Sequence, residues 1–143
     1  MWSVVVIVMG GAAAGVTAIG RALAAEMNWR FVNEHDSSDS SEATTLTRVH
    51  DTRLLAGRER SQWLRRFRST IATAIDRREH VVVACPILTH VDRQALQSGL
   101  RPIRFVSLQQ VTRASVAAND VVIADAVWPT ERILGVIRDE FGL

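Results

Sequence analysis

The first twenty residues constrain the fold most strongly, because an apolar run stops at glycine and is followed by a helical pattern. The run from Val4 to Val8 is β-branched throughout and too short for a helix, as is typical of a strand at the centre of a parallel sheet. Residues 10–17 are then rich in Gly and Ala. Ile19, Leu23 and Met27 follow at the spacing of one helical face. The stretch therefore predicts a buried strand, a glycine turn and a helix.

The glycine turn has the outline of a phosphate-binding loop of the pattern G-x-x-x-x-G-K-[ST]. Gly10, Gly15 and Thr17 occupy the two glycine positions and the hydroxyl position, but Val16 stands where the pattern has lysine. All 17 residues counted as Lys or Arg are arginines, so no lysine elsewhere in the chain can replace it. The residues predicted to bind phosphate or nucleotide are Gly10, Gly11, Ala12, Ala13, Ala14, Gly15, Val16 and Thr17.

Length and composition predict one globular domain, residues 1–143, with 48% apolar residues to form its core. Cys85 is the only cysteine, so no internal disulfide is expected and a reducing, cytoplasmic location is the default. The four histidines lack the spacing of a zinc site, and no structural metal is expected. Residues 1–20 are uncharged, but they lack a basic leader and contain four glycines, so no membrane role is expected.

The rest of the chain alternates strand and helix patterns after a first helix that ends near Asn28. Strands are predicted at 29–32, 81–85, 103–106 and 121–124, and helices at about 58–78, about 92–98 and from Thr130, which is expected to cap the last helix. This alternation predicts an α/β, three-layer fold: a five-stranded parallel sheet with helices on both faces. Ligands then bind at the carboxyl ends of the strands, where segments 10–15, 33–36 and 86–90 converge.

The helix predicted at 58–78 has an arginine-rich side opposite its apolar stripe. Trp63, Phe67 and Ile71 lie four residues apart on the apolar side. The opposite side carries Arg65, Arg66, Arg68 and Arg77. Such a side binds RNA or DNA in some proteins, but a solvated helix has the same pattern and the net charge of +2 is modest. Nucleic acid is therefore not expected as a partner, and binding through these arginines is kept as a minor alternative.

The chain resembles the gluconate kinases, which are relatives of shikimate kinase among the small P-loop kinases. The matching stretches keep their order over nearly the whole chain: Met9–Gly15, Gly20–Ala24, Trp29–Val32, Glu59–Leu64, Val81–Cys85 and Ile103–Val106. The resemblance implies a P-loop NTPase-like fold, a small-molecule ligand such as a sugar acid or phosphate, and ATP with Mg²⁺ as cofactors where the site functions. Thr17 would then be the Mg²⁺ ligand.

The resemblance also assigns residues on the acceptor side. Asp36 is the surviving carboxylate after the second strand and is the expected base for a sugar hydroxyl. His35 stands where shikimate kinase-like enzymes have an aspartate, and Thr89 and His90 replace the Lys-Arg pair of gluconate kinases. Arg60 matches an arginine of the family and is suited to a carboxylate. The expected substrate-binding residues are His35, Arg60 and His90.

The segment after the fourth strand is shorter than the arginine-bearing lid of the family. Residues 109–120 contain one basic residue, Arg113, and are too few to form a closing lid. One cation at the transferring phosphate is worth about 10³ to 10⁵ in rate. We therefore expect a degenerate gluconokinase-like P-loop protein, weak or inactive as a phosphotransferase, that acts as a nucleotide- or anion-binding or interaction module. The alternative is an active ATP-dependent carbohydrate kinase with an altered site, completed by another subunit of a homodimer.

Overall fold

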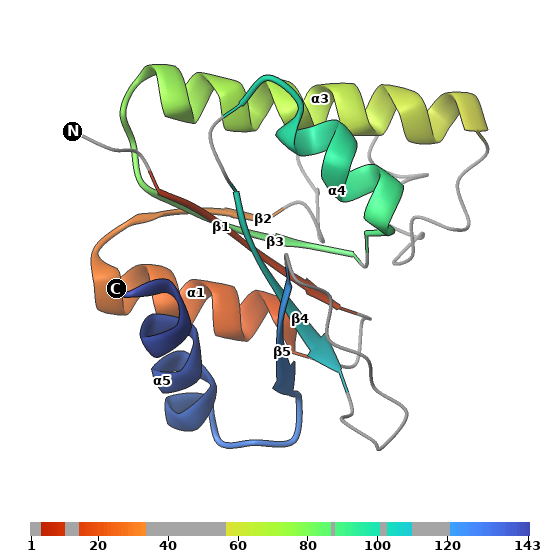
Figure 1. Cartoon of the computed structure of the whole chain (residues 1–143). Coiled ribbons are helices and arrows are strands. Elements are labelled where there is room, and N and C mark those ends of the chain that lie inside the picture. Colours follow the sequence, from red (N-terminus) through yellow and green to blue (C-terminus); the bar gives the residue numbers. More distant parts are fainter. Residues whose placement is uncertain (1–3, 11–14, 34–56, 87, 101–102, 110–120) are drawn as a thin grey trace.

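The computed structural model describes residues 4–10, 15–33, 57–86, 88–100, 103–109 and 121–143, apart from the side chains of residues 57–60. One sheet contains five strands in the order β2-β3-β1-β4-β5, and every neighbouring pair is parallel (Figure 1). The strands are β1 Val5–Gly10, β2 Arg30–Asn33, β3 Val81–Cys85, β4 Arg104–Gln109 and β5 Val121–Asp125. The described helices are α1 Val16–Met27, α3 Gly57–Asp76, α4 His90–Gln97 and α5 Thr130–Phe141. The predicted five-stranded parallel sheet is confirmed.

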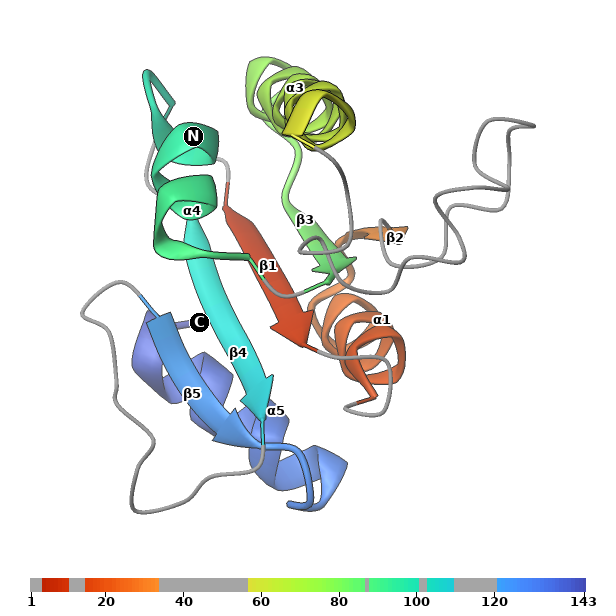
Figure 2. The same cartoon turned by 90° about the vertical axis from the view of Figure 1, so that its right-hand side faces the viewer.

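The central strand β1 is buried on both faces, as its β-branched run predicts. Val5, Ile7 and Met9 belong to the apolar cluster that includes residues of α3 and α4. Val6 and Val8 belong to the opposite cluster, with residues of α1 and α5. Figure 2 shows α3 and α4 on one side of the sheet and α1 and α5 on the other. The three-layer architecture is therefore also as predicted.

Helix α1 is bounded by two residues in the left-handed conformation. Gly15 precedes the helix with φ 73°, and Asn28 ends it with φ 57° as its N–H bonds to carbonyls of the last turn. Within the helix, Gly20 faces the second strand so closely that a Cβ there would lie 2.8 Å from Cε1 of Phe31. A larger residue at this position would require the Phe31 ring or α1 to shift.

Helix α3 packs on one face of the sheet, and the predicted apolar stripe forms the contact. Trp63, Phe67 and Ile71 are all buried. Arg68 departs from the prediction that it shares the solvent-exposed face, because it is half-buried and its guanidinium donates a hydrogen bond to the carbonyl oxygen of Ser98. Arg68 therefore connects α3 to the end of α4.

The start of α4 lies earlier than predicted, and the predicted cap of α5 is wrong. Helix α4 begins at His90 because Thr89 and Asp92 form a capping box. Helix α5 has Pro129 at its N-cap position, and no side chain caps it. Thr130 is already the first residue of α5, since proline with its fixed φ occupies the flanking position.

No helix within the described residues is both long and apolar enough to cross a membrane. The longest, α3, has 20 residues, of which five are arginine.

Candidate functional site

Because all neighbouring pairs are parallel, the carboxyl ends of the five strands lie at the same end of the sheet, which we call the carboxyl edge. The register places Met9 opposite Cys85 and Gln109 opposite Asp125. The strand ends at this edge are Gly10, Asn33, Cys85, Gln109 and Asp125. The predicted convergence of three segments is confirmed for their described residues, while 11–14, 34–36 and 87 lie outside the described part of the chain.

The start of α1 lies at this edge and has a glycine at its N-cap position. Gly15 is exposed, takes φ 73° and has no side chain to cap the helix. The first backbone hydrogen bond of the helix runs from the N–H of Ile19 to the carbonyl oxygen of Gly15 at 3.0 Å. The N–H groups before Ile19 have no intrahelical partner, and they carry the positive end of the helix dipole. This geometry suits a phosphate or another anion.

The two residues after Gly15 differ in how well they fit nucleotide and Mg²⁺. Val16 is only 2% exposed and belongs to the apolar cluster that also contains Val8 and Ile133. Thr17 is half-buried in the first turn and, as a hydroxyl residue, is the one that would hold Mg²⁺ in the predicted loop. Bound Mg²⁺ would neutralise charge on phosphate oxygens. The described first turn of α1 therefore has a buried apolar residue at position 16 and a half-buried hydroxyl residue at position 17.

The start of α4, at the end of β3, is capped by its own side chains. The backbone N–H of Asp92 donates to Oγ1 of Thr89 at 3.2 Å, and the backbone N–H of Thr89 donates to Oδ2 of Asp92 at 2.9 Å. Asp92 is buried, with 3% of its surface exposed. Thr89 is therefore engaged in helix capping.

His90 is exposed at this edge, and a buried arginine lies beneath it. The Nη1 group of Arg93 donates to the carbonyl oxygen of Leu88 at 3.1 Å, and Nη2 lies 3.5 Å from Nδ1 of His90. Arg93 is 8% exposed. Arg93 was not predicted from the sequence. The T-x-x-D capping pattern of residues 89–92 marks the start of α4 and so could have located it.

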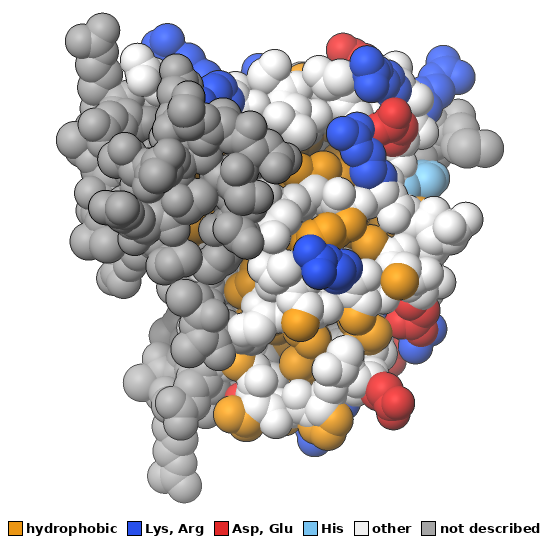
Figure 3. Space-filling model, turned by 180° about the vertical axis from the view of Figure 1, so that it is seen from behind, with side chains coloured by type: hydrophobic (Ala, Val, Ile, Leu, Met, Phe, Trp, Pro, Cys, Tyr) orange, Lys and Arg blue, Asp and Glu red, His pale blue; other side chains and the backbone are white. Residues whose placement is uncertain are grey.

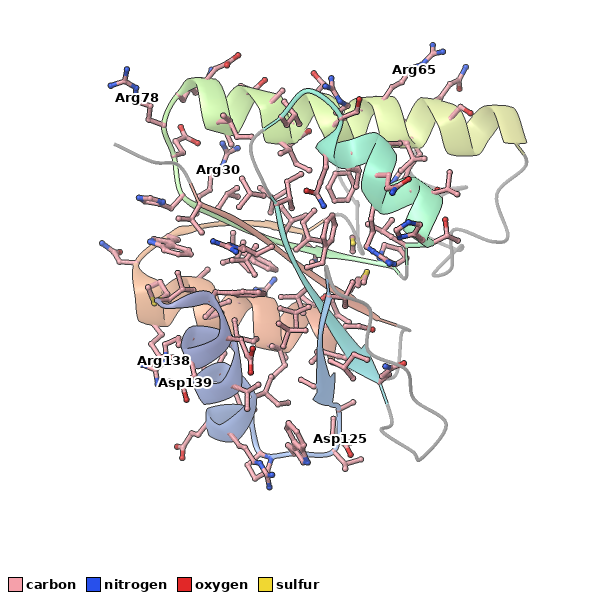
Figure 4. All side chains as sticks on the ribbon, viewed as in Figure 1. Arg30, Arg65, Arg78, Asp125, Arg138 and Asp139 are labelled. Atoms are coloured by element: carbon pink, nitrogen blue, oxygen red, sulfur yellow. The ribbon has the colours of Figure 1, made fainter. Side chains whose placement is uncertain are left out.

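The turn between β5 and α5 adds groups that were not predicted. Oδ1 of Asp125 accepts the N–H of Val127 at 3.0 Å, which shapes the turn after the strand (Figure 4). The guanidinium of Arg132 lies 4.3 Å from the ring centroid of Trp128. Asp125 thus has a local structural role, and the cation and aromatic ring form a pair beside the carboxyl edge.

The remaining predicted site residues stay predictions. His35 and Asp36, like Arg113 of the shortened lid segment, lie outside the described residues. Arg60 is in the first turn of α3, but its side chain is not among those described. Within the described part of the chain, no group of three or more His, Cys, Asp or Glu residues is arranged to hold a metal ion.

Solved structures of small kinases share this fold over almost the whole chain. A sugar kinase from Janibacter sp. HTCC2649 has a TM-score of 0.80 at 19% identity, covering 98% of this chain and 95% of that one. A gluconokinase from Sinorhizobium meliloti 1021 has a TM-score of 0.72 at 19% identity, covering 99% and 93%. A shikimate kinase from Aquifex aeolicus has a TM-score of 0.62 at 8% identity, covering 96% of both chains. The chain has the fold of the small P-loop kinases.

Comparison of the sequence found no match, either to a family model or to a curated protein.

Proposed function

We propose that this chain, with the fold of the small P-loop kinases, binds the phosphates of a nucleotide or another small anion at the start of α1 and has little or no phosphotransferase activity. The observation that supports the proposal most strongly is the environment of Val16. Val16 is the first residue of α1, it is apolar where the phosphate-binding pattern has lysine, and it is buried.

Binding is supported by the backbone at the start of α1. Gly15 holds the left-handed conformation and supplies no capping side chain, and Thr17 follows in the first turn. Backbone N–H groups and the helix dipole bind phosphate without any charged side chain.

Loss of phosphoryl transfer is supported by the missing cation. Transfer depends on positioning and on charge stabilisation at the transferring phosphate, where one cation is worth about 10³ to 10⁵ in rate. That range corresponds to about 4 to 7 kcal/mol of barrier height. Val16 supplies no charge, and the chain contains no lysine that could approach from elsewhere.

The second candidate is an active ATP-dependent carbohydrate kinase with an altered site. The half-buried hydroxyl of Thr17 supports it, because this group retains the position of a Mg²⁺ ligand. Two of the structural neighbours are a sugar kinase and a gluconokinase, which makes gluconate the natural acceptor to test.

The test combines a binding titration with a turnover assay. Mg·ATP is titrated while the melting temperature is followed, since a ligand at about 100 times its Kd stabilises the folded state by about 2.7 kcal/mol. ADP release is then measured with and without gluconate. We expect a concentration-dependent rise in melting temperature and no gluconate-dependent ADP release. No rise at millimolar ATP would overturn the binding proposal, and gluconate-dependent turnover would establish the kinase instead.

The variant Val16→Lys tests the assignment of the loop. We expect it to bind Mg·ATP about tenfold more tightly, because a lysine at this position reaches the β- and γ-phosphates. Val16→Met is the matched control, since methionine is long and flexible but uncharged. Equal ATP affinity in both variants would contradict the assignment of Val16 to the lysine position.

A further inference from the structure

His80 lies where β1, β2 and β3 begin, at the end of the sheet opposite the carboxyl edge. Its carbonyl oxygen accepts the N–H of Arg30, the first residue of β2, at 3.2 Å. Its ring nitrogen Nδ1 accepts the N–H of Val4, just before β1, at 3.0 Å. The carbonyl oxygen of Val4 in turn accepts the N–H of Val81, the first residue of β3, at 3.0 Å. His80 therefore connects the starts of three neighbouring strands.

The bond from Val4 to the His80 ring differs from the two backbone bonds, because its acceptor can be protonated. A backbone N–H can only donate, so Nδ1 accepts this bond as an unprotonated nitrogen. In imidazolium both ring nitrogens carry protons, and neither of them can accept. Histidine is the side chain that ordinarily changes charge between pH 5 and 8. One proton on His80 therefore removes the bond to Val4 and leaves the two backbone bonds in place.

The ring of His80 has a second contact, with Trp29. The two ring centroids lie 5.0 Å apart and the ring planes meet at 23°, so the rings are stacked. Trp29 is held in turn, because its N–H donates to the carbonyl oxygen of Ala24 at 2.8 Å and its side chain packs against the cluster that includes residues of α1 and α5. A cation over the face of an indole ring is attracted to it. Protonation therefore favours the contact with Trp29 and removes the contact with Val4.

Charged groups of both signs lie on the elements that meet at this end of the sheet. Glu79 forms an ion pair with Arg30 at 3.0 Å. Glu26 of α1 forms another with Arg138 of α5 at 2.9 Å. Viewed from behind, acidic and basic side chains are interspersed along the right-hand side of the molecule, where the strands begin (Figure 3). Together with these four, the described charged residues here are Asp76, Arg77, Arg78, Arg104, Asp139 and Glu140. Since the two signs are mixed, the two ring contacts decide the response of His80.

We propose that His80 is a pH-sensitive tie for the start of β1. With a neutral ring, Nδ1 holds the N–H of Val4 and extends the connection between β1 and β3 by one residue. With a protonated ring, His80 stays on Trp29 as a cation and releases this N–H. Mildly acidic pH therefore loosens the chain at Val4. The anion site proposed above lies at the other end of β1, so this inference does not depend on it.

The test follows the amide of Val4 and the ring of His80 by NMR as the pH is lowered from about 7.5 to about 5.5. We expect the chemical shifts of the amide and the ring to change together. Hydrogen exchange at Val4, corrected for the intrinsic exchange rate at each pH, should become about fivefold less protected, the factor that corresponds to one ordinary hydrogen bond. The amide of Ile7, in the middle of β1, should keep its protection.

Two variants separate the two contacts of the ring. In His80→Asn the side-chain oxygen takes the place of Nδ1 and does not titrate, so we expect Val4 to stay protected at both pH values. In His80→Phe an aromatic ring stays on Trp29 without an acceptor, so we expect low protection at both pH values.

The matched control is His90→Asn, which removes an exposed histidine at the carboxyl edge and should keep the full pH response of Val4. Circular dichroism verifies that all three variants are folded. A Val4 amide that does not respond to pH in the unsubstituted chain would overturn the proposal. A response that persists in His80→Asn, or that is lost in His90→Asn, would overturn it as well.

Discussion

Helices α1 and α4 follow neighbouring strands, and both begin at the carboxyl edge of the sheet. The two helix starts differ in the side chains that cap their backbone N–H groups. At the start of α1, the N-cap residue is Gly15, which has no side chain with which to cap the first N–H groups. At the start of α4, Thr89 and Asp92 exchange two hydrogen bonds, and the buried Arg93 bonds to the carbonyl oxygen of Leu88. Among the described residues, the start of α4 is closed by its own side chains, whereas Gly15 supplies none at the start of α1.

The difference between the two helix starts predicts that one affects ligand binding and the other affects stability. A helix N-terminus attracts an external anion only where its N–H groups are not already paired. Substitutions at the start of α1 should therefore change anion affinity, and substitutions at the start of α4 should change the free energy of unfolding. Three pairs of variants test this separation.

The largest effect is expected from Arg93→Met. The variant keeps a long side chain but loses the charged hydrogen bond to Leu88 and the contact with His90. Hydrogen bonds of charged groups contribute about 1.5 to 3 kcal/mol, and we expect unfolding in urea to become easier by about 2 to 3 kcal/mol. Gln94→Met, at the exposed next position, should change stability by less than about 0.5 kcal/mol. Similar stabilities for the two variants would refute the structural role of Arg93.

An intermediate effect is expected from Gly15→Ala. Gly15 has φ 73°, where a side chain costs about 1 to 2 kcal/mol, and the altered turn should also weaken Mg·ATP binding. Gly135→Ala is the opposite control, because Gly135 lies within α5 and no atom lies within 4 Å of an added Cβ. That change should stabilise the protein by about 0.5 to 1 kcal/mol. Stabilisation by both substitutions, measured by thermal unfolding, would contradict the left-handed conformation of Gly15.

The smallest effect distinguishes the two threonines. Thr89→Ala removes a cap and should destabilise the protein by about 1 kcal/mol without changing Mg·ATP affinity. Thr17→Ala should leave stability within about 0.5 kcal/mol, but it should remove the Mg²⁺ dependence of ATP affinity. Thermal unfolding and calorimetric titration of both variants measure the two effects. Loss of ATP affinity on Thr89→Ala would show that the start of α4 contributes to the nucleotide site.

Predictions from sequence succeeded where the structure depends on residues that are close together in the sequence. The β-branched run specifies β1, and the apolar stripe of Trp63, Phe67 and Ile71 specifies the buried side of α3. Asn28 ends α1 as expected, because it tolerates the left-handed conformation. The prediction failed at Thr130, since Pro129 occupies the N-cap position of α5. The acceptor residues Asp36 and His35 lie outside the described chain and remain predictions.

What the sequence by itself determined is the order of strands and helices, the glycine turn and the absence of a lysine at Val16. Only the tertiary structure decided which arginines are available. Arg68 reaches the carbonyl oxygen of Ser98 and Arg93 is buried beneath His90, whereas Arg65 is exposed. The physical reason is length: an arginine side chain spans from one element to the next, so its partner depends on how distant segments pack. The glycine at position 15 acts through its own backbone, and its role can therefore be read locally.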